Sequence, residues 1–234
     1  MTSSRNVVNL LPSHVAFIMD GNRRWAKKNN LPIIDGHKMG SEVIKKIVRK
    51  SLNLKIKYLT FYSFSTENWN RSKDEVFQLQ TLLEFYLDSE IDTFIEKKIN
   101  FSFIGEISRF DSTIKKKLNH LKQITSNYNN LFFTLALSYG SRSEILNSVR
   151  KIIENKVKII KEKHITENLM TKNIPDPDLV IRTSGEKRLS NFLLWQIAYS
   201  ELYFTKTLWP QFSVSKYMLA LNDYMNRKRR FGGD

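Results

Sequence analysis

The stretch HVAFIMDGNRRWAKK, residues 14–28, decides the fold class of this chain. It opens with a mostly apolar run of strand length and passes directly into an acid, a glycine, an asparagine and two arginines. Near-continuous apolar strands are typical of parallel sheets, which helices cover on both faces. Open parallel sheets bind ligands outside the carboxyl ends of their strands, so the charged residues are expected at a ligand site.

Further apolar runs of strand length alternate with segments of helical period. Strands are predicted at 14–19, 58–63, 101–104, 131–137 and 178–182, with a short sixth strand near 201–204. Helices are predicted at 39–54, 74–97, 111–125, 141–162 and 213–226. This alternation predicts an α/β fold with a largely parallel central sheet flanked by helices. The length favours one domain, 1–234, with a flexible lead at 1–13 and a C-terminal tail at 227–234.

The composition favours an anionic partner and a reducing compartment. The 38 Lys and Arg against 23 Asp and Glu give a formal charge of +15, which suits nucleic acid, phosphorylated molecules or an anionic membrane face. The absence of Cys excludes disulfides and thiolate metal sites. No signal peptide is expected, and no apolar run approaches the roughly 20 residues that span a bilayer. Any membrane contact is therefore expected to be peripheral.

The residues after the first strand suit a diphosphate. Gly21 permits a tight turn, and the helix that follows can offer free N–H groups to phosphate oxygens. Arg23 and Arg24 add guanidinium donors, whose geometry matches phosphate. Asp20 is explained if a Mg²⁺ links its carboxylate to the diphosphate. The segment is equally compatible with Asp20 as a simple helix cap and with solvated arginines.

Two more polar segments are expected at the same edge. In RTSGEKRLS, residues 182–190, Arg182 and Arg188 flank a Ser-Gly turn and could hold a second anion, although a plain basic surface loop fits as well. In FSTENWNR, residues 64–71, Phe64 and Trp69 lie beside polar groups, which suits a ligand with an apolar body and a charged head. The alternative is that Trp69 closes the edge of the core.

Five ordered blocks carry a family resemblance. They are HVAFIMDGNRRWAKK, GHKMG, FYSFSTENWNR, DLVIRTSGEKRLSNFLLWQIAYSELYFTKTLWP and RRFGG, and together they run from His14 to Gly233. They resemble the cis-prenyltransferase family, above all its members that make undecaprenyl diphosphate. The resemblance implies a Mg²⁺-dependent enzyme that adds isopentenyl diphosphate repeatedly to farnesyl diphosphate, with an apolar tunnel for the product.

The resemblance also implies roles for individual residues. Asp20 and Asn68 take the catalytic positions, and Asp20 and Glu201 take those of the Mg²⁺ ligands along one edge of the sheet. The positions that bind the two substrates are Gly21, Asn22, Arg23, Arg24, Trp25, His37, Ser65, Thr66, Glu67, Trp69, Arg71, Arg182, Arg188, Leu189 and Ser190. Asn68 matches a residue assigned as proton acceptor. A neutral amide is a very weak base, so we expect Asn68 to orient a water or a diphosphate oxygen instead.

Further implications concern product length, assembly and location. Leu131 matches a residue at the tunnel floor that limits product length, with an ordinary core leucine as the alternative. Arg230 and Gly232 match a terminal Arg-x-Gly that reaches into the partner of a homodimer; otherwise the basic tail is solvated. The product would serve as the lipid carrier of cell-wall synthesis. A cytoplasmic enzyme at the inner face of the membrane is expected.

The chain departs from the family pattern at a few positions. Ile33 stands where the family has an arginine, and Arg23 stands where many bacterial members have glycine, so Arg23 is expected to compensate for the missing charge. Ser138 and Ser141 replace an asparagine and a glycine. Two other functions compete. One is a non-catalytic scaffold of a two-chain prenyltransferase, which the presence of Asp20 disfavours, and the other is a nucleic-acid binder suggested by the charge; we expect no nucleic acid as partner.

Overall fold

The computed structural model describes residues 11–228 and is built around one six-stranded sheet. All neighbouring strands are parallel, in the order β3-β4-β2-β1-β5-β6. The strands are β1 (His14–Ile18), β2 (Tyr58–Ser65), β3 (Ile99–Ile104), β4 (Leu131–Tyr139), β5 (Leu179–Arg182) and β6 (Glu201–Phe204). The predicted α/β fold with a parallel central sheet is thereby confirmed, including the short sixth strand.

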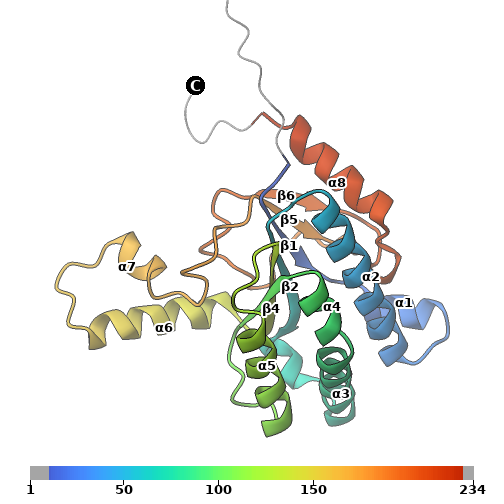
Figure 1. Cartoon of the computed structure of the whole chain (residues 1–234), viewed down its shortest axis with the longest axis horizontal. Helices are drawn as coiled ribbons and strands as arrows, with labels where there is room; N and C mark the ends of the chain where they lie inside the picture. Colours follow the sequence, from blue (N-terminus) through green and yellow to red (C-terminus); the bar gives the residue numbers. More distant parts are fainter. Residues whose placement is uncertain (1–10, 229–234) are drawn as a thin grey trace, which may run out of the picture.

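Helices cover both faces of the sheet, which explains why β1 is buried along its whole length. In Figure 1, α6 and α7 extend on one side of the sheet, and α2 and α8 lie on the other. The helices are α1 (Asn22–Lys28), α2 (Ile33–Asn53), α3 (Lys73–Ser89), α4 (Ile91–Glu96), α5 (Ser112–Ile124), α6 (Ser141–Glu154), α7 (Glu162–Thr166) and α8 (Val214–Asn226). Two short 3-10 helices, η1 (Thr66–Asn70) and η2 (Trp209–Gln211), complete the set.

Three predicted helices differ from those observed. The helix predicted at 39–54 begins six residues earlier, at Ile33, directly after Pro32. The helix predicted at 74–97 is broken at Glu90 into α3 and α4. The helix predicted at 141–162 ends at Glu154, and Lys156 adopts a left-handed φ of 54° that helices use to terminate.

The register of the strands brings three polar segments together. Ile18 at the end of β1 is aligned with Tyr62 of β2 and with Arg182 of β5. The residues after these positions therefore meet at one edge, which we call the carboxyl edge. The opposite, amino edge carries the strand beginnings. None of the helices in residues 11–228 is both long enough and apolar enough to cross a bilayer.

Candidate active site

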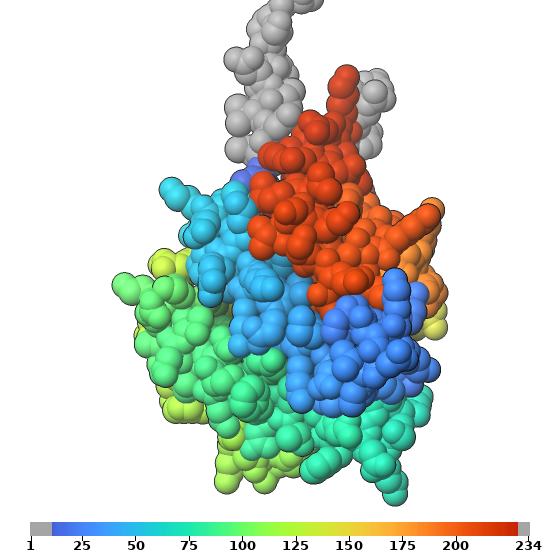
Figure 2. Space-filling model, turned by 90° about the vertical axis from the view of Figure 1, so that its right-hand side faces the viewer, coloured from blue at the N-terminus to red at the C-terminus, as the bar shows by residue number. Residues whose placement is uncertain are grey.

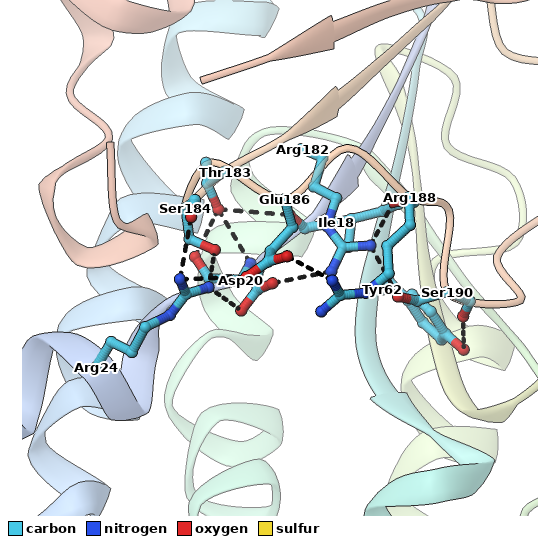
Figure 3. A network of polar contacts seen from close by, with 10 residues as sticks. All are labelled: Ile18, Asp20, Arg24, Tyr62, Arg182, Thr183, Ser184, Glu186, Arg188 and Ser190. Atoms are coloured by element: carbon cyan, nitrogen blue, oxygen red, sulfur yellow. Dashed lines mark hydrogen bonds and ion pairs between the residues drawn. The ribbon is translucent and has the colours of Figure 1, made fainter. Parts of the chain in front are cut away.

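Asp20 is the centre of the polar cluster at the carboxyl edge (Figure 3). Its backbone is fixed by Thr183, whose hydroxyl oxygen accepts from the Asp20 N–H at 3.0 Å and donates to the Asp20 carbonyl at 2.6 Å. One carboxylate oxygen lies 2.9 Å from Nη2 of Arg182, and the other lies 3.2 Å from Nη2 of Arg24. Burial alone would raise the pKa of Asp20, but Arg182 and Arg24 outweigh it and hold the pKa below its usual value. The carboxylate is therefore ionised at neutral pH.

Arg182 links the cluster to the 182–190 loop. Its side chain is 4% exposed, and its Nη1 donates to the Ser190 hydroxyl at 2.7 Å and to the Arg188 carbonyl. Its Nε is buried without a partner in the described part of the chain. A buried guanidinium that holds both Asp20 and the loop explains how residues 162 positions apart in sequence are kept in register.

Arg24 and Arg188 stand nearer to solvent, and Glu186 lies between them. Arg24 donates to the Ser184 carbonyl at 3.1 Å and to the Ser184 hydroxyl, and it lies 3.4 Å from Glu186. Arg188 also pairs with Glu186, and its side chain is 64% exposed. The sequence analysis missed Glu186, because a lone acid in a basic loop gives no signal of its own.

A second group of cations surrounds His37. Arg71 lies 2.9 Å from Glu75, and Arg23 lies 3.7 Å from the same carboxylate. Burial and the positive charges of Arg71 and Arg23 lower the pKa of His37 to about 4, so the imidazole is neutral at pH 7. Its Nε2 is buried and has no partner among residues 11–228. Glu75 was also missed. Ile33 is the first residue of α2, and compensation by Arg23 stays a prediction.

Gly21 allows the chain to turn from β1 into α1. Its φ is +111°, and a Cβ there would lie 3.0 Å from the side chain of Leu208. The turn starts the helix that presents Arg23 and Arg24. Asn22 follows directly, and its side-chain oxygen is buried without a partner in the described residues. The cluster thus contains unsatisfied polar atoms of two kinds: the Asn22 oxygen requires a donor or a cation, and Nε of Arg182 requires an acceptor such as a phosphate oxygen.

The η1 turn carries Asn68 and is held by local hydrogen bonds. The side-chain oxygen of Asn68 accepts from the backbone N–H of Ser65 at 3.1 Å. Burial would raise the pKa of Glu67, but hydrogen bonds from Ser65, Thr66 and Asn191 keep it lowered. An amide whose oxygen already accepts a backbone hydrogen bond is poorly suited to take a proton from a substrate.

Trp69 packs away from the main site. Its Nε1 donates to the Ser138 hydroxyl at 2.8 Å, the Arg109 guanidinium lies 4.3 Å from its ring centroid, and Phe110 packs edge-on against it. Trp69 and Thr66 line a smaller cavity of about 410 Å³. This packing agrees with the alternative that Trp69 closes the edge of the core, and its role in substrate binding stays a prediction.

One cavity of about 760 Å³ connects the polar cluster to the apolar interior. Its wall includes Ile44 and Val48 of α2 and Leu79 and Leu83 of α3, and it continues to Ile99 at the amino edge. Of the predicted site residues, the lining includes Asp20, Asn22, His37, Ser65, Asn68, Arg71, Arg182 and Ser190. It does not include Gly21, Arg23, Arg24, Trp25, Thr66, Glu67, Trp69, Arg188 or Leu189. The functional roles of both groups stay predictions.

The expectation that Glu201 and Asp20 lie along the same edge of the sheet is wrong within one chain. Glu201 opens β6 in register with Leu179, whereas Asp20 follows the far end of β1. The Glu201 carboxylate instead lies 2.6 Å from Nη1 of Arg227. Strand direction is the reason, because the first residue of a parallel strand lies at the amino edge. Glu201 as a metal ligand remains an untested prediction.

Leu131 is a core residue at the amino edge of the sheet. Leu131 opens β4, is fully buried, and is paired in register with Ile99, which lines the cavity, although Leu131 itself does not. Its role as a length limit therefore stays a prediction. Arg230 and Gly232 lie outside the described residues.

The residues at Asp20 fit a magnesium ion only together with a substrate. Within residues 11–228, no group of three or more His, Cys, Asp or Glu side chains forms a metal-binding arrangement. Mg²⁺ is commonly held by one or two carboxylates plus substrate phosphates and water. The ionised carboxylate of Asp20, which lines the cavity, meets that requirement with a single protein ligand.

Comparisons with known proteins match this geometry. The family model described as "Putative undecaprenyl diphosphate synthase" matches residues 18–232. The isoprenyl transferase of Aquifex pyrophilus is 47% identical over 95% of this chain and 96% of its own length. The ditrans,polycis-undecaprenyl-diphosphate synthase of Micrococcus luteus is 44% identical, covering 95% of this chain and 92% of that protein.

Solved structures agree with the sequence relatives. Lavandulyl diphosphate synthase from Lavandula x intermedia, in complex with dimethylallyl diphosphate, superposes with a TM-score of 0.90 at 36% identity, over 95% of this chain and 98% of that one. A probable undecaprenyl diphosphate synthase from Campylobacter jejuni gives 0.82 at 34% identity, over 96% and 100%. Together with the polar cluster and its cavity, these matches show that the chain belongs to the undecaprenyl diphosphate synthase family of cis-prenyltransferases.

Proposed function

We propose that the protein condenses isopentenyl diphosphate repeatedly onto farnesyl diphosphate with cis stereochemistry and makes a long-chain polyprenyl diphosphate. Undecaprenyl diphosphate, the lipid carrier of cell-wall synthesis, is the expected product. The observation that carries the proposal is the single cavity that joins a carboxylate–guanidinium cluster to an apolar interior. A ligand with a diphosphate head and a hydrocarbon tail requires both environments.

The allylic diphosphate is assigned to the segment from Gly21 to Trp25 together with His37 and Arg71. Breaking the allylic C–O bond leaves the electron pair on the departing diphosphate, whose negative charge grows in the transition state. Guanidinium groups that are already held in place by Glu75 and Ser184 stabilise that charge without reorganising. Loss of one such donor is expected to cost about 3 kcal/mol in transition-state stabilisation.

Asp20 is the residue that would hold Mg²⁺. The ion would supply further electrostatic stabilisation of charge on the diphosphate when bound. The ion pairs of Asp20 with Arg24 and Arg182 keep its carboxylate oriented before any ligand arrives. This preorganisation supports its assignment as the essential acid.

The second substrate is assigned to Arg182, Arg188, Leu189 and Ser190. These residues need only hold the isopentenyl diphosphate so that its alkene faces the allylic carbon, which is catalysis by positioning. The new C–C bond forms as the alkene electrons reach that carbon, and one proton must then leave the adduct. We assign this proton to a water or to a diphosphate oxygen that Asn68 orients.

The assembly and location remain part of the proposal. A homodimer in the cytoplasm is proposed from the family resemblance alone, and the +15 charge supports peripheral contact with an anionic membrane face. A non-catalytic scaffold subunit is the second candidate, and Asp20 with its ordered partners argues against it. Nucleic-acid binding has no support in the cavity, since an apolar interior does not suit a polyanion.

Turnover by the purified chain tests the proposal. Protein supplied with farnesyl diphosphate, labelled isopentenyl diphosphate and Mg²⁺ should yield label extractable into butanol, and chelation of the metal should stop it. Asp20→Ala should abolish incorporation, with Lys116→Ala, a substitution on the exposed face of α5, as the control. Absence of product from the wild type would reject the proposal, and product only after addition of a second subunit would favour the scaffold.

A further inference from the structure

Five cations gather at the amino edge below β2, β4 and β3. We call this set the basic face: Arg49, Lys50, Lys55, Lys57 and Lys98. Arg49 and Lys50 lie in the last part of α2, Lys55 and Lys57 precede β2, and Lys98 precedes β3. Four of them are exposed, and Lys50 is half-buried.

None of the five cations of the basic face has a carboxylate partner in residues 11–228. At the carboxyl edge, by contrast, Arg24 and Arg182 are paired with acids. On the flank of α3, Lys117 lies 2.8 Å from Glu84 and 2.6 Å from Asp88. What sets the basic face apart is that five such cations gather at one edge of the sheet.

Hydrogen bonds hold the basic face together as one surface. The Asn130 N–H donates to the Lys98 carbonyl at 3.2 Å, and the Phe132 N–H donates to the Lys57 carbonyl at 2.8 Å. Lys57 Nζ also donates to the Asn129 carbonyl at 3.4 Å. Figure 2 shows the light-blue end of α2 bordering the green α3–α4 segment on this part of the molecule.

The apolar end of the cavity reaches the same surface. Arg49 and Lys97 are exposed and also line the cavity, as do Leu52, Phe94 and Ile99. Ile95, next to Phe94 on α4, is 41% exposed. Glu90 and Glu96 line this end as well, but they are ion-paired with Lys45 and Lys97. The basic face thus lies beside the hydrocarbon end of the cavity, at the opposite edge of the sheet from Asp20.

We propose that the basic face docks on an anionic phospholipid bilayer, with the apolar end of the cavity against the membrane and the diphosphate site directed to water. Unpaired cations near an anionic leaflet attract it within a Debye length. The apolar opening suits lipid tails and offers nothing to a nucleic acid, which decides between the two polyanions. The identification of the water-facing cluster as a diphosphate site rests on the proposed function, whereas the docking of the basic face does not.

Vesicle sedimentation tests the docking. Full-length protein is mixed with phosphatidylcholine vesicles that contain phosphatidylglycerol, or with phosphatidylcholine alone. The test variant is Lys50→Gln, Lys55→Asn, Lys57→Gln and Lys98→Asn combined; asparagine is chosen where φ is 58° and 52° because it tolerates that conformation. The control combines Lys116→Gln, Lys163→Gln, Lys172→Gln and Lys216→Gln. It removes the same number of positive charges, but from exposed positions outside the basic face.

Wild type and control should bind the anionic vesicles similarly, and the test variant should bind several hundredfold more weakly, since each basic residue near the membrane contributes about fivefold. Equal losses in both variants, or no binding by the wild type, would overturn the proposal. Wild-type binding to single-stranded RNA but not to vesicles would overturn it in favour of nucleic acid. Prenyl transfer in detergent without vesicles should be unchanged in the test variant, so failure of the proposed function would appear separately as absent turnover in every protein.

Discussion

Arg182 and Arg188 make the most informative pair of substitutions, because the resemblance assigns them one role and the structure gives them different surroundings. Arg182→Lys keeps the charge but replaces a fork of donors that reaches Asp20, Ser190 and the Arg188 carbonyl. A lysine can keep one of these three bonds. Losing two bonds to a charged buried donor, at about 1.5 kcal/mol each, should cost about 3 kcal/mol of stability.

Arg188→Lys should behave differently. The Arg188 side chain is 64% exposed, and its ion pair with Glu186 is screened by solvent, so the substitution should cost under about 1 kcal/mol. Its effect should appear instead as a raised KM for isopentenyl diphosphate. The Tm of Arg182→Lys should lie roughly 6–12 °C below that of the wild type, since 1 kcal/mol of stability corresponds to about 2–4 °C for a chain of this size. Equal shifts in the two variants would refute the buried-scaffold reasoning.

Three further predictions concern stability and product length. Burial lowers the pKa of His14 to about 4, so the neutral imidazole contributes to the free energy of unfolding fully above pH 6.5 and progressively less as the pH drops toward 4. Between these pH values, urea unfolding should show the wild type losing about 3 kcal/mol more than His14→Gln. Equal losses in the two proteins would contradict this. A double-mutant cycle of Trp69→Phe and Ser138→Ala should give a coupling near 1 kcal/mol for their 2.8 Å hydrogen bond, whereas strictly additive losses would remove the bond's importance. Leu131→Ala should destabilise the chain by about 2–5 kcal/mol and lengthen the product seen by chromatography; unchanged length would retire its role as a limit.

The strands could be predicted because burial on both faces leaves nearly uninterrupted apolar runs. Those at 14–19, 58–63 and 131–137 agree with β1, β2 and β4 to within two residues. The helix ends were harder. Ile159 and Ile160 continue the apolar spacing of α6, yet they are 73% and 50% exposed, because the chain leaves the helix at Asn155. Apolar periodicity alone cannot distinguish a packed helix face from exposed residues beyond its end.

The predicted helix at 39–54 omits the first six residues of α2, which begins at Ile33. Gly36 and Gly40 both lie inside the observed helix. Their function is close packing: a Cβ on Gly36 would lie 2.3 Å from the Asn22 carbonyl, and one on Gly40 would lie 2.6 Å from the Asn22 side-chain oxygen. Such contacts depend on the tertiary arrangement of α1 and α2, which no local pattern contains.

The site could be predicted where strand ends alone decide position. Asp20 closely follows Ile18, which is aligned with Arg182 of the neighbouring strand, so the meeting of Asp20 and Arg182 follows from the parallel sheet. Glu201 was misplaced because a motif resemblance carries no information about which end of a strand it occupies. Glu75 and Glu186 were missed because their value comes from the arginines that they orient in space.

The cavity that runs from Asp20 to Ile99 has a kinetic consequence for any chain that lengthens inside it. Each added isoprene unit brings five more carbons into contact with apolar walls, and each buried methylene contributes about 0.8 kcal/mol. Escape of an intermediate should therefore become slower with every addition while free wall remains. Short oligomers would be retained for the next round, and release would begin only when further carbons find no more wall to cover.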